Sequence, residues 1–363
     1  MFTVFTDGVT LFDDLFICID NAKEYIFIES YIFRDDRLGQ KLKRLLIKKS
    51  RENVKISIIY DQIGCLFTSK KFFCELRANG IHVTHFFDPL LYILPRNLNN
   101  RNHQKIWVID GEISYLGGFN IGSEYLGKSK KFGNWRDTHV KLLGVHARHL
   151  AYNIYKDLIT LTAAAPLWLH NLNISSDYDL SPHFLEIIRN DPLNNNSDIH
   201  SKFIDIIQNA ANYVFIQTPY FIPDKKIISA LKSAAKKGVD VKIMIPNKPD
   251  HPIVYWGTYY FAGELLHEGI KCFTYNKGFL HSKTIIVDDC VCSIGSSNFD
   301  MRSFNLNYEI NTFIYSQYTT CMLRKIFEQD ITSCNLLTLD IYQARSPYVR
   351  FKELIARLIS PLL

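Results

Sequence analysis

The sequence lacks any run of the roughly 18 to 20 apolar residues that a helix needs to span a bilayer. The nearest candidate, residues 158–169, is shorter and contains Pro166, which predicts a buried helix followed by a loop. The eight cysteines form no CxxC pair, and no signal peptide opens the chain. We therefore expect reduced intracellular thiols rather than disulfides or metal ligands. No cluster of metal-ligating residues is evident, so the sequence predicts no metal and no cofactor.

Composition is that of a folded protein. Hydrophobic residues make up 47% of the 363 residues and charged residues 21%, which leaves no case for disorder. The length fits two domains of ordinary size. The net charge of +6 suits an anionic partner, whether a lipid headgroup, a nucleic acid or a phosphorylated substrate, without choosing among them.

One stretch occurs twice. HQKIWVIDGEISYLGGFN begins at His103, and HSKTIIVDDCVCSIGSSN begins at His281, 178 residues later. Each copy continues with a lysine, an aspartate and an asparagine at identical spacing: Lys105, Asp110 and Asn120 in the first copy, and Lys283, Asp288 and Asn298 in the second. This repetition indicates a tandem duplication whose halves each bring a histidine and a lysine to one place.

Strands and helices alternate in the same order in both halves. In the first half, apolar runs at 25–28, 54–60 and 81–87 are separated by helices predicted over 36–49 and 70–79. This order predicts an α/β fold of two pseudo-twofold related repeats, each a mixed, largely parallel sheet flanked by helices. The expected domains are residues 1–164 for the first repeat, 165–200 for a connection, 201–345 for the second repeat and 346–363 for a C-terminal amphipathic segment.

Two imidazoles and two ammonium groups at one site suit phosphodiester chemistry. One neutral histidine can attack phosphorus and carry a covalent phosphohistidine, while the other, protonated, gives its proton to the leaving alkoxide. The lysines can neutralise non-bridging oxygens, and the amides of Asn120 and Asn298 can donate to phosphate oxygens. Asp110 and Asp288 fall at predicted turns, so we expect them to support the backbone more than to touch substrate.

Each histidine needs an acceptor for its second ring nitrogen. Asp137, in NWRDTH, follows the first motif, and Glu309, in LNYEIN, follows the second. We expect Asp137 to orient His103 and Glu309 to orient His281. Surface ion pairs are the alternative role for both carboxylates.

The doubled pattern HxKx4Dx6G[GS]xN resembles the signature of the phospholipase D superfamily. Phrases such as RNHQKIWVIDG, QTPYFIPD, IMIPNKPDHP and RSFNLNYEIN are similar to those of bacterial cardiolipin synthases, and the similarity is weakest between about 155 and 200. The resemblance implies two phospholipase D-like repeats and a phosphatidyltransferase that converts two phosphatidylglycerol molecules into cardiolipin and glycerol. It implies a catalytic set of six residues: His103, Lys105, Asp110, His281, Lys283 and Asp288. By resemblance to related enzymes, His103 is the nucleophile and His281 the acid.

Three alternatives stay open. The chain could be a phospholipase D with water as acceptor, a phosphodiesterase nuclease, or a catalytically idle membrane-binding remnant, although no nucleic-acid partner is expected. Many members of the family carry N-terminal membrane-spanning helices, and this sequence has none. We therefore expect peripheral attachment to the anionic surface of a bacterial cell membrane, on the cytoplasmic side.

Two further segments have two interpretations each. The aromatic tract at 251–266 is either a core helix or an interfacial lip where Trp256, Tyr259 and Tyr260 meet headgroups. The last segment predicts a helix with one apolar face, formed by Phe351, Leu354, Ile355, Leu358, Ile359 and Leu362. We expect this face to dock on the protein, and the bilayer interface is the alternative.

Overall fold

The computed structural model describes residues 2–86, 99–161, 165–172, 174, 184–192 and 197–360. The chain divides into two compact units, which are described separately. Unit 1 comprises Met1–Ser129 and Thr138–Ser181, and unit 2 comprises Lys130–Asp137 and Pro182–Leu363. The short segment Lys130–Asp137 thus comes from the first half of the sequence but belongs to unit 2.

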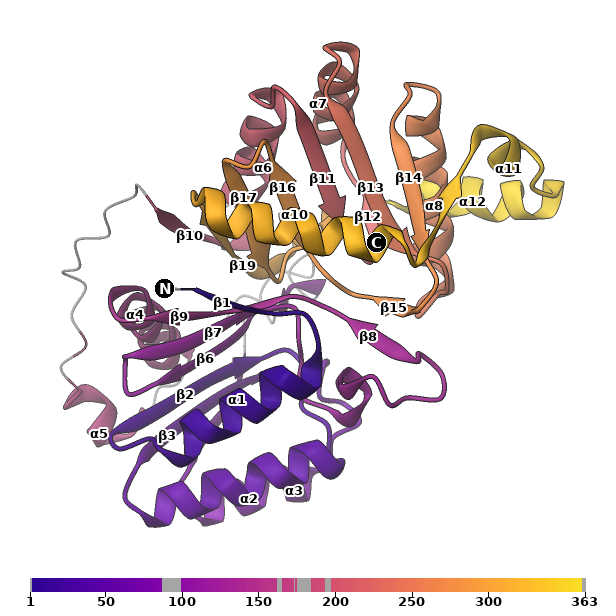
Figure 1. Ribbon diagram of the computed structural model, residues 1–363. Coiled ribbons are helices and arrows are strands. Elements are labelled where there is room, and N and C mark those ends of the chain that lie inside the picture. The colour runs from indigo at the N-terminus through magenta and orange to yellow at the C-terminus, as the bar shows by residue number, and fades with distance from the viewer. Residues whose placement is uncertain are drawn as a thin grey trace. The chain divides into compact units, whose positions relative to one another are not determined.

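The sheet of unit 1 has the strand order β1-β9-β7-β6-β2-β3-β4 (Figure 1). Strands β2, β3 and β4 pair in parallel, and the other neighbours pair antiparallel. The strand bounds are β1 Thr3–Phe5, β2 Tyr25–Ser30, β3 Lys55–Asp61, β4 His82–Phe86, β6 Lys105–Ile109, β7 Ile113–Gly117 and β9 His139–Leu143. The short strand β5, Arg101–Asn102, immediately precedes the first motif.

Helices cover both faces of this sheet. Figure 1 shows α1 (Gly8–Asp20), α2 (Arg37–Arg51) and α3 (Lys70–Ala78) on one side and α4 (Val145–Leu161) on the other. The first three begin at side chains that accept hydrogen bonds from the first turn, namely Asp7, Asp36 and Ser69. Helix α2 buries leucines spaced by four residues, as its sequence predicts. Two short helices complete the unit, η2 (Ser123–Leu126) and α5 (Leu167–His170).

The main sheet of unit 2 repeats this plan in the order β10-β19-β17-β16-β11-β13-β14-β20. Strands β11, β13 and β14 pair in parallel, and the remaining neighbours along this order pair antiparallel. The bounds are β10 Leu185–Asn190, β11 Tyr213–Gln217, β13 Asp240–Pro246, β14 Lys271–Tyr275, β16 Thr284–Val287, β17 Val291–Gly295, β19 Asn307–Ile314 and β20 Cys334–Leu337. Two strand pairs lie apart from it: β8 (Asn134–Arg136) with β15 (Gly278–Leu280), and β12 (Phe221–Ile222) with β18 (Phe299–Asp300).

Helices α6 (Asp198–Gln208), α7 (Lys225–Lys236) and α8 (Pro252–Leu266) cover one face of the unit 2 sheet, and α10 (Gln317–Ile331) crosses the other (Figure 1). A buried apolar cluster joins α6, α7 and α8 to the central strands β11, β13 and β16. The remaining helices are α9 (Met301–Asn305), α11 (Leu339–Gln343) and α12 (Pro347–Ile359). Helix α12 packs against α8.

The predicted mixed α/β architecture in two repeats is confirmed, but the prediction that each sheet is largely parallel is wrong. Along the described strands of each main sheet, only two pairs of neighbours are parallel. The motif strands cause the difference, because β6–β7 and β16–β17 are hairpins with short turns, and such hairpins pair antiparallel. Within residues 165–200, the segment expected to connect the repeats, β10 forms and pairs with β19.

All eight cysteines are free thiols. In the part of the chain that the structure describes, no helix has both the length and the apolarity needed to cross a membrane.

Candidate active site

The second motif lies in unit 2, in the three-residue link between β15 and β16. His281 is 7% exposed, and its Nδ1 atom lies 2.5 Å from Oδ2 of Asp137, which is completely buried. A carboxylate at this distance fixes which ring nitrogen faces away from it and stabilises a positive charge on the ring. The Nε2 atom of His281 is therefore set up for reaction.

Strand pairing explains why Asp137 reaches His281. Strand β8 runs parallel to β15 with Arg136 opposite Leu280, and the backbone N–H of His281 donates to the carbonyl oxygen of Arg136 at 2.7 Å. The Trp135 ring centroid lies 5.1 Å from that of His281. The segment Lys130–Asp137 thus supplies both the Trp135 ring beside His281 and the Asp137 carboxylate that holds His281.

This geometry corrects the expected pairing of carboxylates and histidines. Asp137, which was expected to orient His103, orients His281, and it occupies the Nδ1 atom for which Glu309 was the expected partner. Glu309 is completely buried in unit 2, where it accepts hydrogen bonds from Ser296 Oγ and Asn307 Nδ2. Proximity in the sequence predicted the wrong histidine for Asp137. The reason is that β8 belongs to unit 2, although its residues follow the first motif.

Lys283 is 2% exposed, and its Nζ donates to the backbone oxygen of His281. Burial lowers its pKa to about 8, while the carboxylates of Asp137 and Glu309 act in the opposite direction. A cation that is poorly solvated and partly balanced by buried carboxylates binds strongly to an arriving phosphate oxygen. The same burial makes its charge sensitive to mildly alkaline pH.

Asn298 closes the second motif and is 4% exposed. Its side-chain oxygen has no hydrogen-bond partner among the described residues, whereas its backbone N–H donates to Ser303 Oγ at 3.3 Å. Nearby, Asp300 caps α9 through Ser303, and burial raises the pKa of its carboxyl to about 6. The Asn298 amide therefore retains hydrogen-bonding capacity inside a polar, buried setting.

The first motif has the same local arrangement in unit 1. His103 and Gln104 precede β6, which begins at Lys105. The side chain of Lys105 is fully buried and donates to the backbone oxygen of His103. The Tyr31 ring meets the His103 ring edge to face, with centroids 4.9 Å apart, and Lys105 Nζ lies 5.3 Å from the Tyr31 centroid. Both motifs therefore bring their histidine and lysine together.

Asn120 repeats the feature seen at Asn298. It is 3% exposed, its Nδ2 lies 3.2 Å from Tyr125 Oη, and its Oδ1 is unpaired among the residues the structure describes. Rotation of the amide by half a turn would let Oδ1 accept from the tyrosine hydroxyl and direct two N–H groups at the unoccupied side. An oxygen-rich ligand would then complete the hydrogen bonding of Asn120.

Asp110 and Asp288 point away from the histidines and bind backbone. Asp110 accepts from the N–H groups of Lys23, Glu24 and Tyr25 at 2.8–3.0 Å. Asp288 accepts from the equivalent N–H groups of Ala211, Asn212 and Tyr213 at 2.6–2.8 Å. Each aspartate therefore fixes the segment that enters β2 or β11 to the motif turn, in keeping with the expected supporting role.

Aspartate also suits the backbone of these turns. Asp110 has φ 52° and Asp288 has φ 54°, values in the left-handed region. Aspartate and asparagine tolerate this region better than most residues other than glycine.

Sequence reasoning missed a buried polar network beside His281. Arg136 Nε pairs with Asp330 Oδ2 at 2.8 Å, and Gln217 Nε2 donates to the same oxygen at 2.9 Å. Gln217 Oε1 accepts from Ser282 Oγ at 3.3 Å and Thr284 Oγ1 at 3.2 Å. The signal was present, since Gln217 ends the YVFIQ run that echoes YIFIE, whose Glu29 accepts from Gln104 at 3.2 Å.

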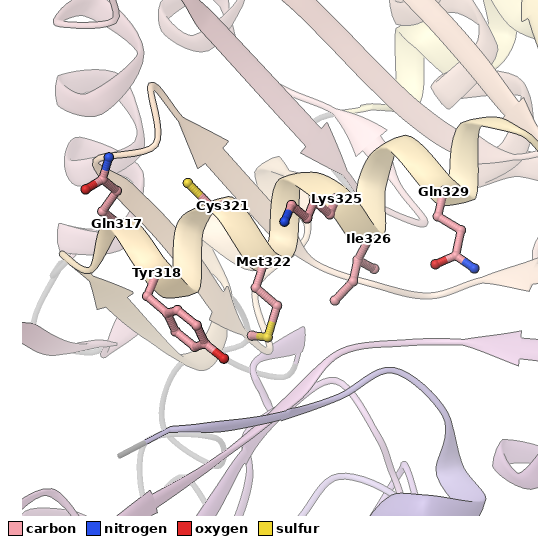
Figure 2. A pocket seen from close by; sticks show the side chains of 7 residues that line it. All are labelled: Gln317, Tyr318, Cys321, Met322, Lys325, Ile326 and Gln329. Carbon is pink, nitrogen blue, oxygen red and sulfur yellow. The ribbon is translucent and has the colours of Figure 1, made fainter.

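The hollow along α10 lies apart from the motif residues. Its volume is about 560 Å³, and Figure 2 shows Tyr318, Met322 and Ile326 projecting from one side of the helix. No motif residue lines it. Within the described ranges, no group of three or more His, Cys, Asp or Glu side chains is arranged to hold a metal ion. The motif residues therefore carry the candidate chemistry.

Comparisons with known proteins agree with the motifs. The family model described as cardiolipin synthase, PLD-like domain, matches residues 15–131 and 203–331. The cardiolipin synthase of Oceanobacillus iheyensis is 43% identical over 360 residues, which cover 99% of this chain and 74% of that protein. The major cardiolipin synthase of Bacillus subtilis is 42% identical over 367 residues, with 99% and 75% covered.

The fold is also found among solved structures. The phosphatidylserine synthase of Haemophilus influenzae Rd KW20 aligns with a TM-score of 0.79 at 16% sequence identity, covering 100% of this chain and 95% of that one. At this identity the likeness supports the fold alone.

Proposed function

This chain belongs to the cardiolipin synthases with phospholipase D-like domains, and we propose that it transfers a phosphatidyl group from one phosphatidylglycerol to another, giving cardiolipin and glycerol. The observation that carries the mechanism is the buried Asp137–His281 pair beside Lys283, in a chain that repeats the motif at His103.

In the first step, the Nε2 atom of His103 attacks phosphorus, and the bond from phosphorus to the glycerol oxygen breaks. His281 gives its proton to that oxygen, so glycerol leaves and phosphatidyl-His103 remains. Asp137 supports this role because its carboxylate stabilises the protonated ring before transfer and fixes its orientation.

In the second step, neutral His281 takes the proton of a hydroxyl on the second phosphatidylglycerol. The resulting oxygen attacks phosphorus, the P–N bond to His103 breaks, and cardiolipin forms. Both histidines then regain their starting protonation states, so atoms and protons balance over the cycle.

Lys105 and Lys283 neutralise the non-bridging phosphate oxygens as charge redistributes. The amide of Asn120, turned so that its N–H groups face the phosphate, donates to a phosphate oxygen, while the Asn298 side chain bonds to Asp300 beside the second motif. Asp110 and Asp288 act through the backbone that they hold.

The substrate is a bilayer lipid, so we propose that the protein works at an anionic membrane surface of a bacterial cell and attaches peripherally. Eight free thiols are compatible with the reducing cytoplasmic side.

The test is incubation of purified protein with labelled phosphatidylglycerol in mixed micelles, followed by separation of the lipid products. Cardiolipin with an equal yield of glycerol is expected. Phosphatidic acid as the main product would identify water as the acceptor, and the absence of product from a folded protein would indicate an idle enzyme. His281→Gln is the control for chemistry, and its melting temperature verifies that loss of activity is not loss of fold.

A further inference from the structure

Helix α12 exposes its apolar side. Exposure is 59% for Phe351, 44% for Leu354, 43% for Ile355 and 71% for Leu358, and Tyr348 on the same stripe is 66% exposed. At 100° per residue these five positions span about a third of the helix circumference. The expectation that this face docks on the protein is wrong for these positions, Ile359 is only partly buried, and Leu362 lies outside the described residues.

The opposite side of α12 is fixed to unit 2. Ala356 is fully buried and Glu353 is 2% exposed, and Glu353 Oε2 pairs with Arg345 Nη1 at 2.8 Å. Helix α12 lies against the aromatic tract of α8, as Figure 1 shows at the yellow end of the chain. The ion pair and this packing hold the apolar stripe outward, so its exposure is built into the fold.

Basic side chains line both edges of the stripe. Lys352 lies on one edge, 4.6 Å from the Trp256 ring centroid and 4.0 Å from that of Tyr348. Arg350 and Arg357 lie on the other edge, and both are exposed. The only acidic residue of α12 is Glu353, which is buried and paired, so the exposed surface of this helix carries positive charge without a negative one.

The positive charge continues from α12 onto α7. Arg357 borders an open hollow of about 940 Å³ whose other basic residues are Lys225, Lys226, Lys232 and Lys236, against the acidic Asp224 and Glu264. Lys232 pairs with Glu264 at 3.1 Å and Lys236 with Glu268 at 3.8 Å, so Lys225, Lys226 and Arg357 set the sign of this surface. An apolar stripe with basic edges, next to a basic hollow, matches acyl chains next to anionic headgroups.

We propose that α12 lies on the surface of an anionic lipid bilayer, with Phe351, Leu354 and Leu358 among the acyl chains and Arg350, Lys352 and Arg357 on the headgroup phosphates. The proposal rests on the proposed function only for its premise that the substrate is a bilayer lipid. This surface positions the enzyme on its substrate without taking part in the chemistry. A second copy of the chain is the competing occupant of the stripe.

Vesicle binding tests the apolar stripe. The 363-residue chain is centrifuged with sucrose-loaded vesicles of phosphatidylglycerol and phosphatidylcholine, or of phosphatidylcholine alone. The Phe351→Ser/Leu358→Ser variant should lower the partition coefficient on the anionic vesicles at least tenfold. The control Ile17→Ser, at an exposed apolar position of α1 with 63% exposure, should change it less than twofold. Equal binding by the double variant and the wild-type protein would overturn the proposal.

The basic edge is tested by one matched pair of charge changes. Arg357→Gln should weaken binding to anionic vesicles about fivefold, with the loss shrinking at high salt. Lys71→Gln, an equal charge change at an 84% exposed side chain of α3, should have little effect. If Arg357→Gln and Lys71→Gln behave alike, net charge and not α12 governs attachment, and the proposal fails.

Two further readouts separate the competing explanations. Turnover of a short-chain, water-soluble phosphatidylglycerol should be equal in the wild-type protein and the stripe variant, because α12 is outside the chemistry. Vesicle binding without any product would refute the proposed function but leave this inference standing. If the stripe variant instead converts a dimer into a monomer in sedimentation velocity and retains vesicle binding, the face is an interface between copies, which overturns the proposal.

Discussion

The Oδ2 atom of Asp137 lies 2.5 Å from the Nδ1 atom of His281, a residue 144 positions later in the sequence. Neither side chain has appreciable contact with solvent, so the pair is held by the protein and not by water. It links the segment after the first motif to the histidine of the second. The site around His281 therefore combines residues from both halves of the sequence, although all of them lie in unit 2.

Asp137→Asn should reduce the maximal rate about 10² to 10³-fold, the effect of losing roughly 3 to 4 kcal/mol of transition-state stabilisation. The amide cannot stabilise a protonated His281 as the carboxylate does. The pH profile of the rate should also shift. The limb of the profile that reports loss of the proton from His281 should move towards lower pH.

Asp289→Asn is the control for Asp137→Asn, since Asp289 contacts Arg324 and Tyr213 and no motif histidine. Equal pH profiles for wild type and Asp137→Asn would mean that the carboxylate has only a structural role.

Deprotonation of Lys283 should lower activity in mildly alkaline solution. Its pKa is lowered to about 8 by burial, so the ammonium is charged below that pH and neutral above it. The value of kcat/KM, which reports groups of the free enzyme, should fall as pH rises through about 8. In Lys283→Arg the fall should move upward by a unit or more, because a guanidinium keeps its proton. A limb that stays in place in Lys283→Arg would assign it to another group.

The same shift affects stability with a definite sign. Because the folded-state pKa is below the unfolded value of 10.5, the unfolded chain binds more protons between pH 8 and pH 10.5. The contribution of Lys283 to the free energy of unfolding should therefore rise with pH across that window. Urea denaturation of Lys283→Met should lack this rise, and an unchanged pH slope in the variant would contradict the prediction.

Asp288→Ala should act on stability and not on chemistry. It leaves three backbone N–H groups without their carboxylate acceptor and places alanine at φ 54°. We expect a loss of about 2 to 4 kcal/mol, or a melting temperature lower by about 5–15 °C. Asp288→Asn should cost less, because asparagine keeps one oxygen acceptor and tolerates this backbone. Activity per folded molecule should be nearly normal, and its loss without destabilisation would place Asp288 in the reaction.

Asp330→Ala should both destabilise unit 2 and slow the reaction. It removes the Asp330 carboxylate that pairs with Arg136, a residue only 5% exposed, and breaking a buried ion pair costs about 3–5 kcal/mol. Since Arg136 precedes Asp137, the positioning carboxylate should shift as well. Lys48→Ala breaks an exposed pair with Asp20 in unit 1 and should change stability little, because water screens an exposed ion pair. The free energy of unfolding of both variants is measured by chemical denaturation. Comparable losses would show that water or other groups replace Asp330 as the partner of Arg136.

Activity should survive exhaustive treatment with EDTA. Lys105 and Lys283, both buried beside the histidines, are positioned to supply the positive charge that a phosphate needs. Turnover before and after treatment is the measurement. A loss that one added divalent ion reverses would mean that the charge comes from a metal.

The sequence was sufficient for features that depend on local order. The doubled motif, its spacing and the repeated strand–helix order predicted two α/β repeats, and the motif phrases indicated the family. Helix α2, Arg37–Arg51, formed close to the predicted range 36–49, with its leucines on the buried face. Such features can be predicted from sequence because periodicity and capping act within a few residues.

Only the tertiary structure decided which carboxylate meets which histidine. Glu309 follows His281 by 28 residues, yet Asp137 holds its ring, because β8 pairs with β15. The exposure of α12 was decided in the same way: its pattern shows that one face is apolar, but the buried Glu353 and Ala356 determine that the apolar face points outward. Strand pairing and helix rotation depend on surfaces that are distant in the sequence, so they are settled only when those surfaces pack together.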